Sequence, residues 1–365
     1  MKNIVIFYPS FEKGGATVVL INLIKYLSKN RYIYLITNKK DKKLKKVKNL
    51  KILLTGNKKL SLINNRIISG IDSAIILLNV LKKINKKNTI VFSMQSNFFA
   101  VILSFIKSVK VIIRVSEDPC GATRYADNKL FAIFVLFTKF ITYNFASKII
   151  TNAKKSQRCV KRFVLNTHKV KLLYNPTLVK ILKKNDYKKK NYFLNVGRLC
   201  KQKNQQILIK AFYEFHKNNK GYKLVLCGDG PDKEQLNLLV KKFKLNNEIK
   251  FLGWKNNMSS IYSKAKLFIL SSYYEGMPNA LIDAINFETP SISFNASGVE
   301  DLLLNGRGGE IIKNYDHHLL AHKMKFAIQN YNKILLKTQI SKKYLNKYCI
   351  ENAGRKYIKY LTWPY

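Results

Sequence analysis

The stretch "LFILSSYYEGMPNALIDA" occupies residues 267–284 and shows a local pattern that recurs along the chain. It opens with a short run without charge, residues 267–272, which predicts a buried strand. Two tyrosines, an acid, a glycine, a proline and an asparagine follow, and an apolar pattern with helical spacing then begins. A strand that leads directly into a helix is the unit from which parallel sheets covered by helices are built.

The same alternation of strand and helix runs through the chain in two series. Amphipathic helical patterns such as 17–29 and 205–217 lie between the strands. Strands of the first series are predicted at residues 3–8, 32–37, 51–54, 89–93, 109–115, 148–152 and 170–174. Strands of the second series are predicted at residues 192–197, 222–227, 248–252, 267–271, 291–294 and 309–312. We therefore expect an α/β fold made of two doubly wound domains.

A lysine-rich and poorly periodic segment, 174–191, separates the two series and fits an interdomain connector. We expect a first domain over residues 1–176 and a second domain over residues 177–345. The remaining residues, 346–365, are expected to form a C-terminal helix that packs back on the first domain.

The 365 residues include 67 Lys and Arg against 20 Asp and Glu, which gives a formal net charge of +47. Most of the excess is lysine, as an AT-rich coding sequence would produce. The charge still attracts anionic partners, either nucleic acid or an acidic membrane surface. The sequence has no RNP pattern, zinc finger or basic helix with heptads, so no specific nucleic acid is expected as a partner. We expect peripheral binding to an anionic membrane surface, released by high salt.

The five cysteines are scattered, odd in number and without a CxxC pair. This usage predicts neither a zinc site nor a disulfide framework, and it fits a reducing compartment.

Two apolar stretches could be mistaken for membrane segments. The N-terminal run is too short for a signal peptide and is expected to be the first strand. The stretch 130–150 is interrupted by Lys139, so a membrane span is not expected there. It is expected to be a core helix of the first domain.

Ligands of open parallel sheets bind at the carboxyl ends of the strands, and several candidate residues follow such ends. Gly14 and Gly15 follow the first strand and precede a helix, where a backbone can approach a phosphate closely. A tight turn would explain the same glycines. Gly197, Arg198 and Lys203 follow the first strand of the second domain, and the two cations could neutralise a diphosphate.

Two further turns lie at strand ends. Gly253 and Trp254 end the strand at 248–252, where the aromatic ring could line a base pocket or pack in the core. The turn at 227–236 is interpreted as structural, with Asp232 helping a helix to start.

The opening stretch combines a helix start with two acids. Pro278 suits the first helical turn, and the amides of Met277, Asn279 and Ala280 would then point toward the strand end as an anion site. Glu275 and Asp283 could accept hydrogen bonds from sugar hydroxyls there. Helix capping and the helix dipole would also explain acids near a helix start.

These motifs resemble those of the retaining glycosyltransferases of family four, which have the GT-B fold. "YYEGMPNALIDA" resembles the signature of two glutamates separated by seven residues. "KGGA" (13–16), "LLYNP" (172–176), "NVGRLCKQKN" (195–204), "GDGP" (228–231), "FLGWKNN" (251–257) and "SGVEDLLLNGRGGEI" (297–311) are similar to further motifs of the family in order and spacing. Within this family, the chain looks most similar to enzymes that act on O-antigen, capsule or lipid-linked oligosaccharide precursors.

The resemblance implies a GT-B fold, in which two Rossmann-like domains face each other across a cleft. The first domain would then be on the acceptor side, and the second would bind a nucleotide-sugar. Arg198 and Lys203 match the pair that holds the diphosphate, and Glu275 matches the acid on the donor sugar. Residues that match the donor-binding loops are Gly14, Gly15, Gly276, Met277, Pro278 and Asn279.

Two positions depart from the family pattern. Asp283 stands where the family has a second glutamate that holds the ribose, and it is one methylene shorter. The segment 112–121 lacks the histidine that many relatives have near the donor sugar. Arg114, Ser116 and Glu117 are the candidates there for acceptor contacts.

The resemblance implies a retaining hexosyltransferase that moves a sugar from a nucleotide-sugar, expected to be UDP-linked, to a saccharide acceptor. The acceptor would be a lipid-linked or surface polysaccharide precursor, and the location would be the inner face of the plasma membrane. No cofactor and no metal is expected, since the sequence has no Asp-x-Asp pair and no His/Cys cluster. A phosphorylase or epimerase of the same fold, a basic nucleic-acid-binding protein and a non-catalytic sugar-nucleotide binder remain as alternatives.

Overall fold

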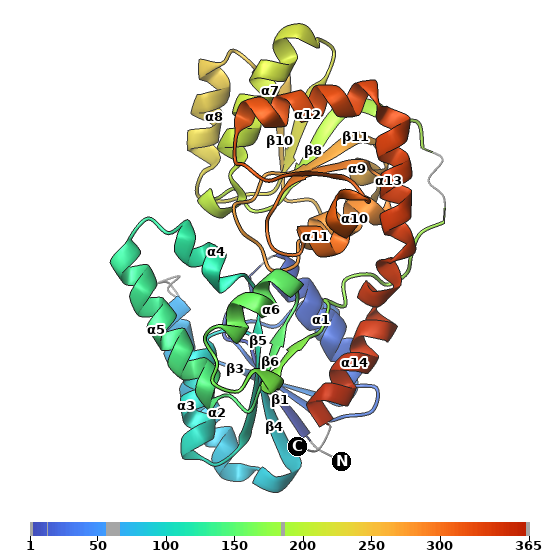
Figure 1. The fold of residues 1–365 in the computed structure, drawn as a ribbon. Helices are drawn as coiled ribbons and strands as arrows, with labels where there is room; N and C mark the ends of the chain where they lie inside the picture. The colour runs from blue at the N-terminus through green and yellow to red at the C-terminus, as the bar shows by residue number, and fades with distance from the viewer. Residues whose placement is uncertain (1–2, 13, 56–65, 184–186, 363–365) are drawn as a thin grey trace. The chain divides into compact units, whose positions relative to one another are not determined.

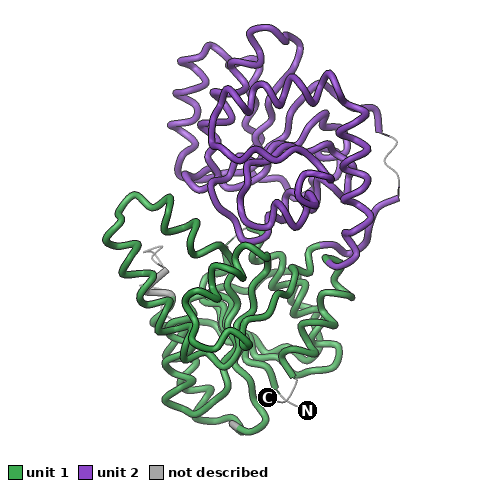
Figure 2. Tube along the Cα trace, viewed as in Figure 1, with its two compact units in different colours: residues 1–177, 348–365 green, residues 178–347 purple. Residues whose placement is uncertain are grey.

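The computed structural model describes residues 3–12, 14–55, 66–183 and 187–362. The chain divides into two compact units, which Figure 2 shows in different colours. Unit 1 comprises residues 1–177 and 348–365, and unit 2 comprises residues 178–347. Each unit contains one parallel sheet, so the predicted α/β fold with two doubly wound domains is confirmed.

Unit 1 contains a seven-stranded sheet in the order β3-β2-β1-β4-β5-β6-β7, and every strand pair is parallel. The strands are β1 (Asn3–Phe7), β2 (Ile33–Thr37), β3 (Leu50–Leu54), β4 (Thr89–Ser93), β5 (Lys110–Val115), β6 (Lys148–Thr151) and β7 (Val170–Leu172). The helices are α1 (Gly15–Leu27), α2 (Arg66–Lys83), α3 (Asn97–Ile106), α4 (Pro119–Arg124), α5 (Lys129–Phe145), α6 (Lys154–Lys161) and α14 (Ile350–Thr362) (Figure 1).

The two faces of this sheet belong to different cores because successive strand side chains point in opposite directions. Ile4 and Ile6 pack with α1 and α14 on one face. Val5 and Phe7 pack with α2, α3, α5 and α6 on the other face.

The C-terminal helix α14 packs on the first unit. Its Tyr357 is buried in the same core as Ile4. A Cβ at Gly354 would lie 2.5 Å from the ring of Tyr26 on α1, so the glycine permits the close approach of the two helices. The predicted boundaries, 176 and 345, lie close to the divisions at Thr177 and Tyr348.

Unit 2 contains a six-stranded parallel sheet in the order β10-β9-β8-β11-β12-β13. The strands are β8 (Lys190–Val196), β9 (Lys223–Cys227), β10 (Ile249–Gly253), β11 (Ala265–Leu270), β12 (Ser291–Phe294) and β13 (Glu310–Ile312). The helices are α7 (Gln205–Asn218), α8 (Lys233–Lys242), α9 (Ser259–Lys264), α10 (Asn279–Asn286), α11 (Val299–Leu302), α12 (His317–Gln329) and α13 (Tyr331–Lys343). All thirteen predicted strands are present, with ends shifted by at most two residues.

Both sheets reverse their strand order once. In unit 2 the chain builds outward from β8 to β10, then returns to place β11 on the other side of β8. In unit 1 the equivalent reversal lies between β1 and β4. The crevice outside the carboxyl ends of two such strands is where open α/β sheets bind ligands.

Among the helices of the described residues, none is both long enough and apolar enough to cross a bilayer.

The loops after β8 and β9 approach each other through their backbones. Gly228 has a φ of +145° and donates its amide to the carbonyl of Gly253 at 2.9 Å. A Cβ at Gly228 would lie only 1.8 Å from the carbonyl oxygen of Gly197. The turn at 227–236, which was predicted to be structural, therefore packs against the loop after β8 that carries Arg198 and Lys203. Asp232 stands at the N-cap of α8, where a helix start was predicted, but its side chain makes no capping hydrogen bond.

Replacing Gly228 should destabilise the protein through this contact. We expect Gly228→Ala to lower the free energy of unfolding by about 3 kcal/mol or more, because backbone must move. Gly221→Ala is the matched control, since Gly221 also has a positive φ, +86°, but an added Cβ there meets nothing within 4 Å. The control should cost only about 1–2 kcal/mol. Equal urea unfolding midpoints for the two variants would contradict the close approach.

Candidate functional site

The loops that follow β8 and β11 are joined at the reversal of the unit 2 sheet. Tyr273 donates its amide to the carbonyl of Gln202 at 2.9 Å, and the Gln202 side chain donates to the carbonyl of Tyr274 at 2.9 Å. The Ser271 hydroxyl donates to the carbonyl of Lys203 at 2.7 Å. These three bonds fix the two loops to each other at the edge of the sheet where a ligand is expected.

An ion pair connects the predicted acid and one of the predicted cations. Lys203 Nζ lies 2.5 Å from Glu275 Oε1, and the Ser272 hydroxyl donates to the same oxygen at 2.7 Å. Glu275 is only 6% exposed. Its second oxygen, Oε2, accepts no hydrogen bond from the described residues, so it is a candidate acceptor for a ligand hydroxyl.

Arg198, the second predicted cation, has a different environment. It is exposed, whereas Gly197 before it is half-buried. Its carbonyl accepts a hydrogen bond of 3.0 Å from the buried side chain of Gln205 at the start of α7. The backbone at Arg198 is thus anchored while its side chain lies at the surface, on the same loop as Lys203.

The loop after β11 continues into α10. Pro278 is the N-cap of this helix, with φ −75° and ψ 96°, so the prediction that it lies inside the first turn is wrong. The first helical positions are Asn279 and Ala280. Amides of a first turn have no acceptor within the helix, and they carry the positive end of its dipole.

The turn before α11 supports this loop. Gly298 has a φ of +81°, and a Cβ there would lie 2.6 Å from the carbonyl oxygen of Gly276. Met277, between Gly276 and the N-cap, is buried. The segment 297–311, one of the motifs behind the resemblance, therefore packs against the start of α10.

Asp283 lies one turn inside α10 and is half-buried. Burial raises its pKa to about 7. In turn, the charge of Asp283 adds to burial in raising the pKa of the buried Tyr262 well above its usual value. Asp283 differs from Glu275 because its side chain makes no ion pair with the described residues.

Trp254 follows β10, which lies at the edge of the unit 2 sheet. The indole is 47% exposed, so the core-packing interpretation is wrong for this residue. Gly253 has a φ of +63°, and its carbonyl receives the amide of Gly228. The structure does not bring Trp254 into the group formed by Lys203 and Glu275, since β9 separates β10 from β8.

The candidates of unit 1 form separate groups. Gly14 is the N-cap of α1 and Gly15 is its first residue, and a Cβ at Gly14 would meet nothing within 4 Å. Lys13 of the "KGGA" motif lies outside the described residues.

Arg114 is only 2% exposed, which sequence reasoning did not anticipate. Its guanidinium donates to Ser116 Oγ at 2.5 Å and to Asn175 Oδ1 at 2.7 Å. The side chain thus connects the end of β5 to the segment after β7. Ser116 is half-buried, and Glu117 is exposed.

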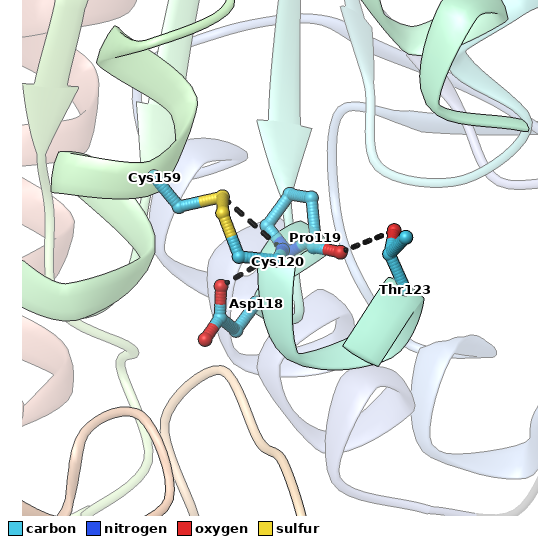
Figure 3. Close-up of a disulfide and its surroundings, with 5 residues drawn as sticks. All are labelled: Asp118, Pro119, Cys120, Thr123 and Cys159. Atoms are coloured by element: carbon cyan, nitrogen blue, oxygen red, sulfur yellow. Dashed lines mark hydrogen bonds between the residues drawn. A yellow bond between two sulfur atoms is a disulfide. The ribbon is translucent and has the colours of Figure 1, made fainter. Parts of the chain in front are cut away.

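The structure corrects the expectation that the cysteines do not pair. Cys120 on α4 and Cys159 on α6 form a disulfide, shown in Figure 3, with their Cα atoms 6.1 Å apart. The Asp118 carboxylate caps α4 by accepting from the amide of Cys120 at 3.1 Å. Atoms of Asp118, Cys120 and Cys159 that could bind a metal lie within 4.8 Å of one another. The two sulfurs are bonded to each other, however, and metal binding by cysteine needs thiolates.

Residues 180–347 match the family "Glycosyl transferases group 1". The chain is also similar to an undecaprenol-diphosphate-linked saccharide α-1,4-N-acetyl-D-galactosaminyltransferase of Campylobacter jejuni. The two are 27% identical over 337 residues, which cover 91% of this chain and 90% of the relative.

Two solved structures show the same fold over nearly the whole chain. Anabaena HepE, solved in complex with UDP and glucose, superposes with a TM-score of 0.80 at 16% identity and covers 99% of this chain and 100% of its own. Sucrose-phosphate synthase from Thermosynechococcus elongatus superposes with a TM-score of 0.82 at 14% identity, and 98% of each chain is covered. With its two parallel-sheet units, the chain thus has the GT-B fold, and residues 180–347 form a group 1 glycosyltransferase domain.

Proposed function

We propose that the protein transfers a sugar from a UDP-sugar to a lipid-linked saccharide, with retention of anomeric configuration and without a metal. The observation that carries this proposal is the Lys203–Glu275 pair at the reversal of the unit 2 sheet. A cation and a half-satisfied carboxylate side by side suit a ligand that has both phosphates and hydroxyls.

The diphosphate would be bound by positive groups of unit 2. Arg198 can reach two oxygens with its planar guanidinium, and Lys203 supplies a compact charge beside Glu275. The first-turn amides of α10 add the positive end of a helix dipole. UDP is proposed as the nucleotide because HepE, which has the same fold, was solved with UDP.

The transferred sugar would be held by Glu275. Lys203 and Ser272 both occupy Oε1 and so orient the carboxylate, while Oε2 can accept from a sugar hydroxyl. Asp283 would accept from the ribose, as the resemblance to the two-acid signature implies.

The reaction breaks the bond from the sugar C1 to the diphosphate oxygen and forms a bond from C1 to an acceptor hydroxyl oxygen, whose proton is released. Negative charge grows on the leaving oxygen in the transition state. Arg198 and Lys203 would stabilise this charge, which is the largest contribution that a preorganised site makes in many enzymes. Retention is proposed from the signature at Glu275 and Asp283.

The acceptor is proposed from the Campylobacter relative, whose name specifies an undecaprenol-diphosphate-linked saccharide. Such a substrate keeps its lipid in a bilayer, so we further propose that the enzyme is peripheral on the cytoplasmic face of the membrane. The net charge of +47 supports attraction to anionic lipid.

A thermal-shift screen with UDP-, GDP- and ADP-sugars tests the donor proposal. A ligand at about 100 times its Kd stabilises a protein by about 2.7 kcal/mol, so the correct nucleotide should raise the melting temperature clearly. NMR of the first-formed glycoside then reports the anomer. No shift with any UDP-sugar would refute the donor, and an inverted product would refute retention.

Replacing Arg198 or Lys203 should lower turnover in both cases but lower the melting temperature in only one. Arg198→Ala and Lys203→Ala should each lower turnover about 10²–10³-fold, as expected for loss of one electrostatic stabiliser. Lys203→Ala should also lower the melting temperature, because it leaves the buried Glu275 carboxylate without its cation. Arg198→Ala should not, because Arg198 is exposed. Near-native turnover of either variant at saturating donor would show that the phosphate lies elsewhere.

Asp283 should make stability depend on pH. Its pKa is about 7 in the folded protein, against 3.8 as the ordinary value, so the unfolded chain releases this proton first. Stability is therefore lost as pH rises from about 4 to about 7 and stays lost above. Asp283→Asn should melt like the native protein near pH 4 and several degrees higher near pH 8. The exposed Asp229→Asn is the control. If the difference in melting temperature between Asp283→Asn and the native protein is the same at pH 4 and pH 8, the raised pKa of Asp283 is contradicted.

A further inference from the structure

Helix α5 exposes its apolar side. Leu130 is 81% exposed, and Phe131, Ile133, Phe134 and Phe137 are each exposed by 59–62%. The buried residues of the helix are instead Ala132, Thr142 and Tyr143. The expectation that this stretch is a core helix is therefore correct only for a narrow stripe, because most of its large apolar side chains point away from the sheet.

Helix α3 extends the same apolar surface. Phe98, Ile102, Phe105 and Ile106 are exposed at helical spacing along one side of α3. The rings of Phe105 on α3 and Phe145 on α5 pack edge to face, with centroids 5.1 Å apart. A groove between the helices is lined by Phe98, Val101, Ile102, Phe105, Ile141, Thr142 and Phe145.

We define the α3–α5 face by the exposed apolar side chains of these two helices. They are Phe98, Ile102, Phe105, Ile106, Leu130, Phe131, Ile133, Phe134, Phe137, Phe140 and Phe145. Elsewhere in the described residues, exposed large apolar side chains occur singly or in pairs on a helix, such as Leu238 on α8, Leu336 and Ile340 on α13, and Ile71 and Ile75 on α2. A contiguous apolar surface of this kind marks a site of contact with another apolar partner.

The charges around the face select the partner. Helices α3 and α5 contain no acid. Lys107 and Lys110 follow α3, and Lys129 begins α5. Lysines around an apolar surface match the anionic headgroups and acyl boundary of a bilayer. A second copy of the chain fits less well, since each copy has a net charge of +47.

The position of the face relates it to the proposed acceptor. Helix α4 and the start of α5 follow the carboxyl end of β5, where Ser116 and Glu117 lie (Figure 1). This is the edge of the unit 1 sheet at which ligands are expected. A saccharide linked to a lipid in the bilayer under α5 would therefore be delivered to that edge.

We propose that the α3–α5 face inserts into the headgroup region of an anionic bilayer and brings the enzyme to its lipid-linked acceptor. The second half of this statement rests on the proposed function, whereas the insertion itself does not. Charge alone would let salt release the protein completely, which is the expectation from the sequence that this proposal revises. Insertion of the aromatic residues predicts that part of the binding resists salt.

Sedimentation with vesicles tests the insertion. The native protein should bind phosphatidylglycerol/phosphatidylethanolamine vesicles, and part of it should stay bound at about 1 M NaCl, where the screening length is about 3 Å. Leu130→Ser/Phe134→Ser/Phe137→Ser should lose this salt-resistant part and bind at least tenfold more weakly at about 0.1 M NaCl. These side chains are exposed, so the variant should fold. Leu238→Ser/Leu336→Ser, the matched control in unit 2, should sediment like the native protein.

Three results would overturn the insertion. One is complete release of the native protein by salt, and another is unchanged sedimentation of the triple variant. The third result has two parts: light scattering shows a dimer of the native protein but a monomer of the triple variant, and neither protein binds vesicles. A second copy of the chain would then cover the α3–α5 face instead of a bilayer. The thermal shift with UDP-sugar, measured on the same variant, separates this test from the proposed function. If no UDP-sugar raises the melting temperature of either the native protein or the triple variant, the donor proposal is refuted but the insertion is not.

Discussion

Glu275 imposes the constraint on which the organisation of unit 2 depends. A carboxylate at the exit of the central strand β11 is nearly buried there, and a buried charge without a partner is strongly destabilising. Lys203 and Ser272 supply the partners, but Lys203 belongs to the loop after β8. The two loops must therefore be fixed to each other, which the backbone bond from Tyr273 to the Gln202 carbonyl helps to do. The same loop then starts α10.

Pairs of a buried glutamate with lysine recur in unit 2. Glu288 is buried and accepts from Lys342 and Gln339, which ties α13 to the loop before β12. Glu310 on β13 accepts from both Lys323 and Lys337. Burial acts to raise the pKa of Glu310, but these two lysines lower it below its ordinary value. With 20 acids against 67 basic residues in the chain, most of the positive charge is left for solvent and for anionic partners.

The elements of the fold were predictable because each strand is a local apolar run between turn residues. Arg198, Lys203 and Glu275 could be chosen from the sequence as candidate site residues because each follows a strand end. Their pairing was not, since Lys203 and Glu275 are 72 residues apart and meet only when β8 and β11 become neighbours. Ser272 and Gln202 were missed for the same reason. The Cys120–Cys159 bond joins residues 39 apart with no spacing motif. In α5 the periodicity revealed an apolar side but could not say whether the sheet covers it.

The two acids of the opening stretch, Glu275 and Asp283, bear on the proposed donor site. Glu275 has one oxygen satisfied by Lys203 and Ser272, while its other oxygen accepts no hydrogen bond within the described part of the chain. Asp283 is partly desolvated and forms no ion pair with the described residues. Burial raises the pKa of Asp283 to about 7, so its ionised form lowers the stability of the folded chain at neutral pH. Hydroxyl groups of a bound sugar and ribose would supply the missing donors. The hydrogen bonds that bind the donor would then also stabilise the folded chain. Sites that are less stable without their ligand are a common result of the balance between stability and activity.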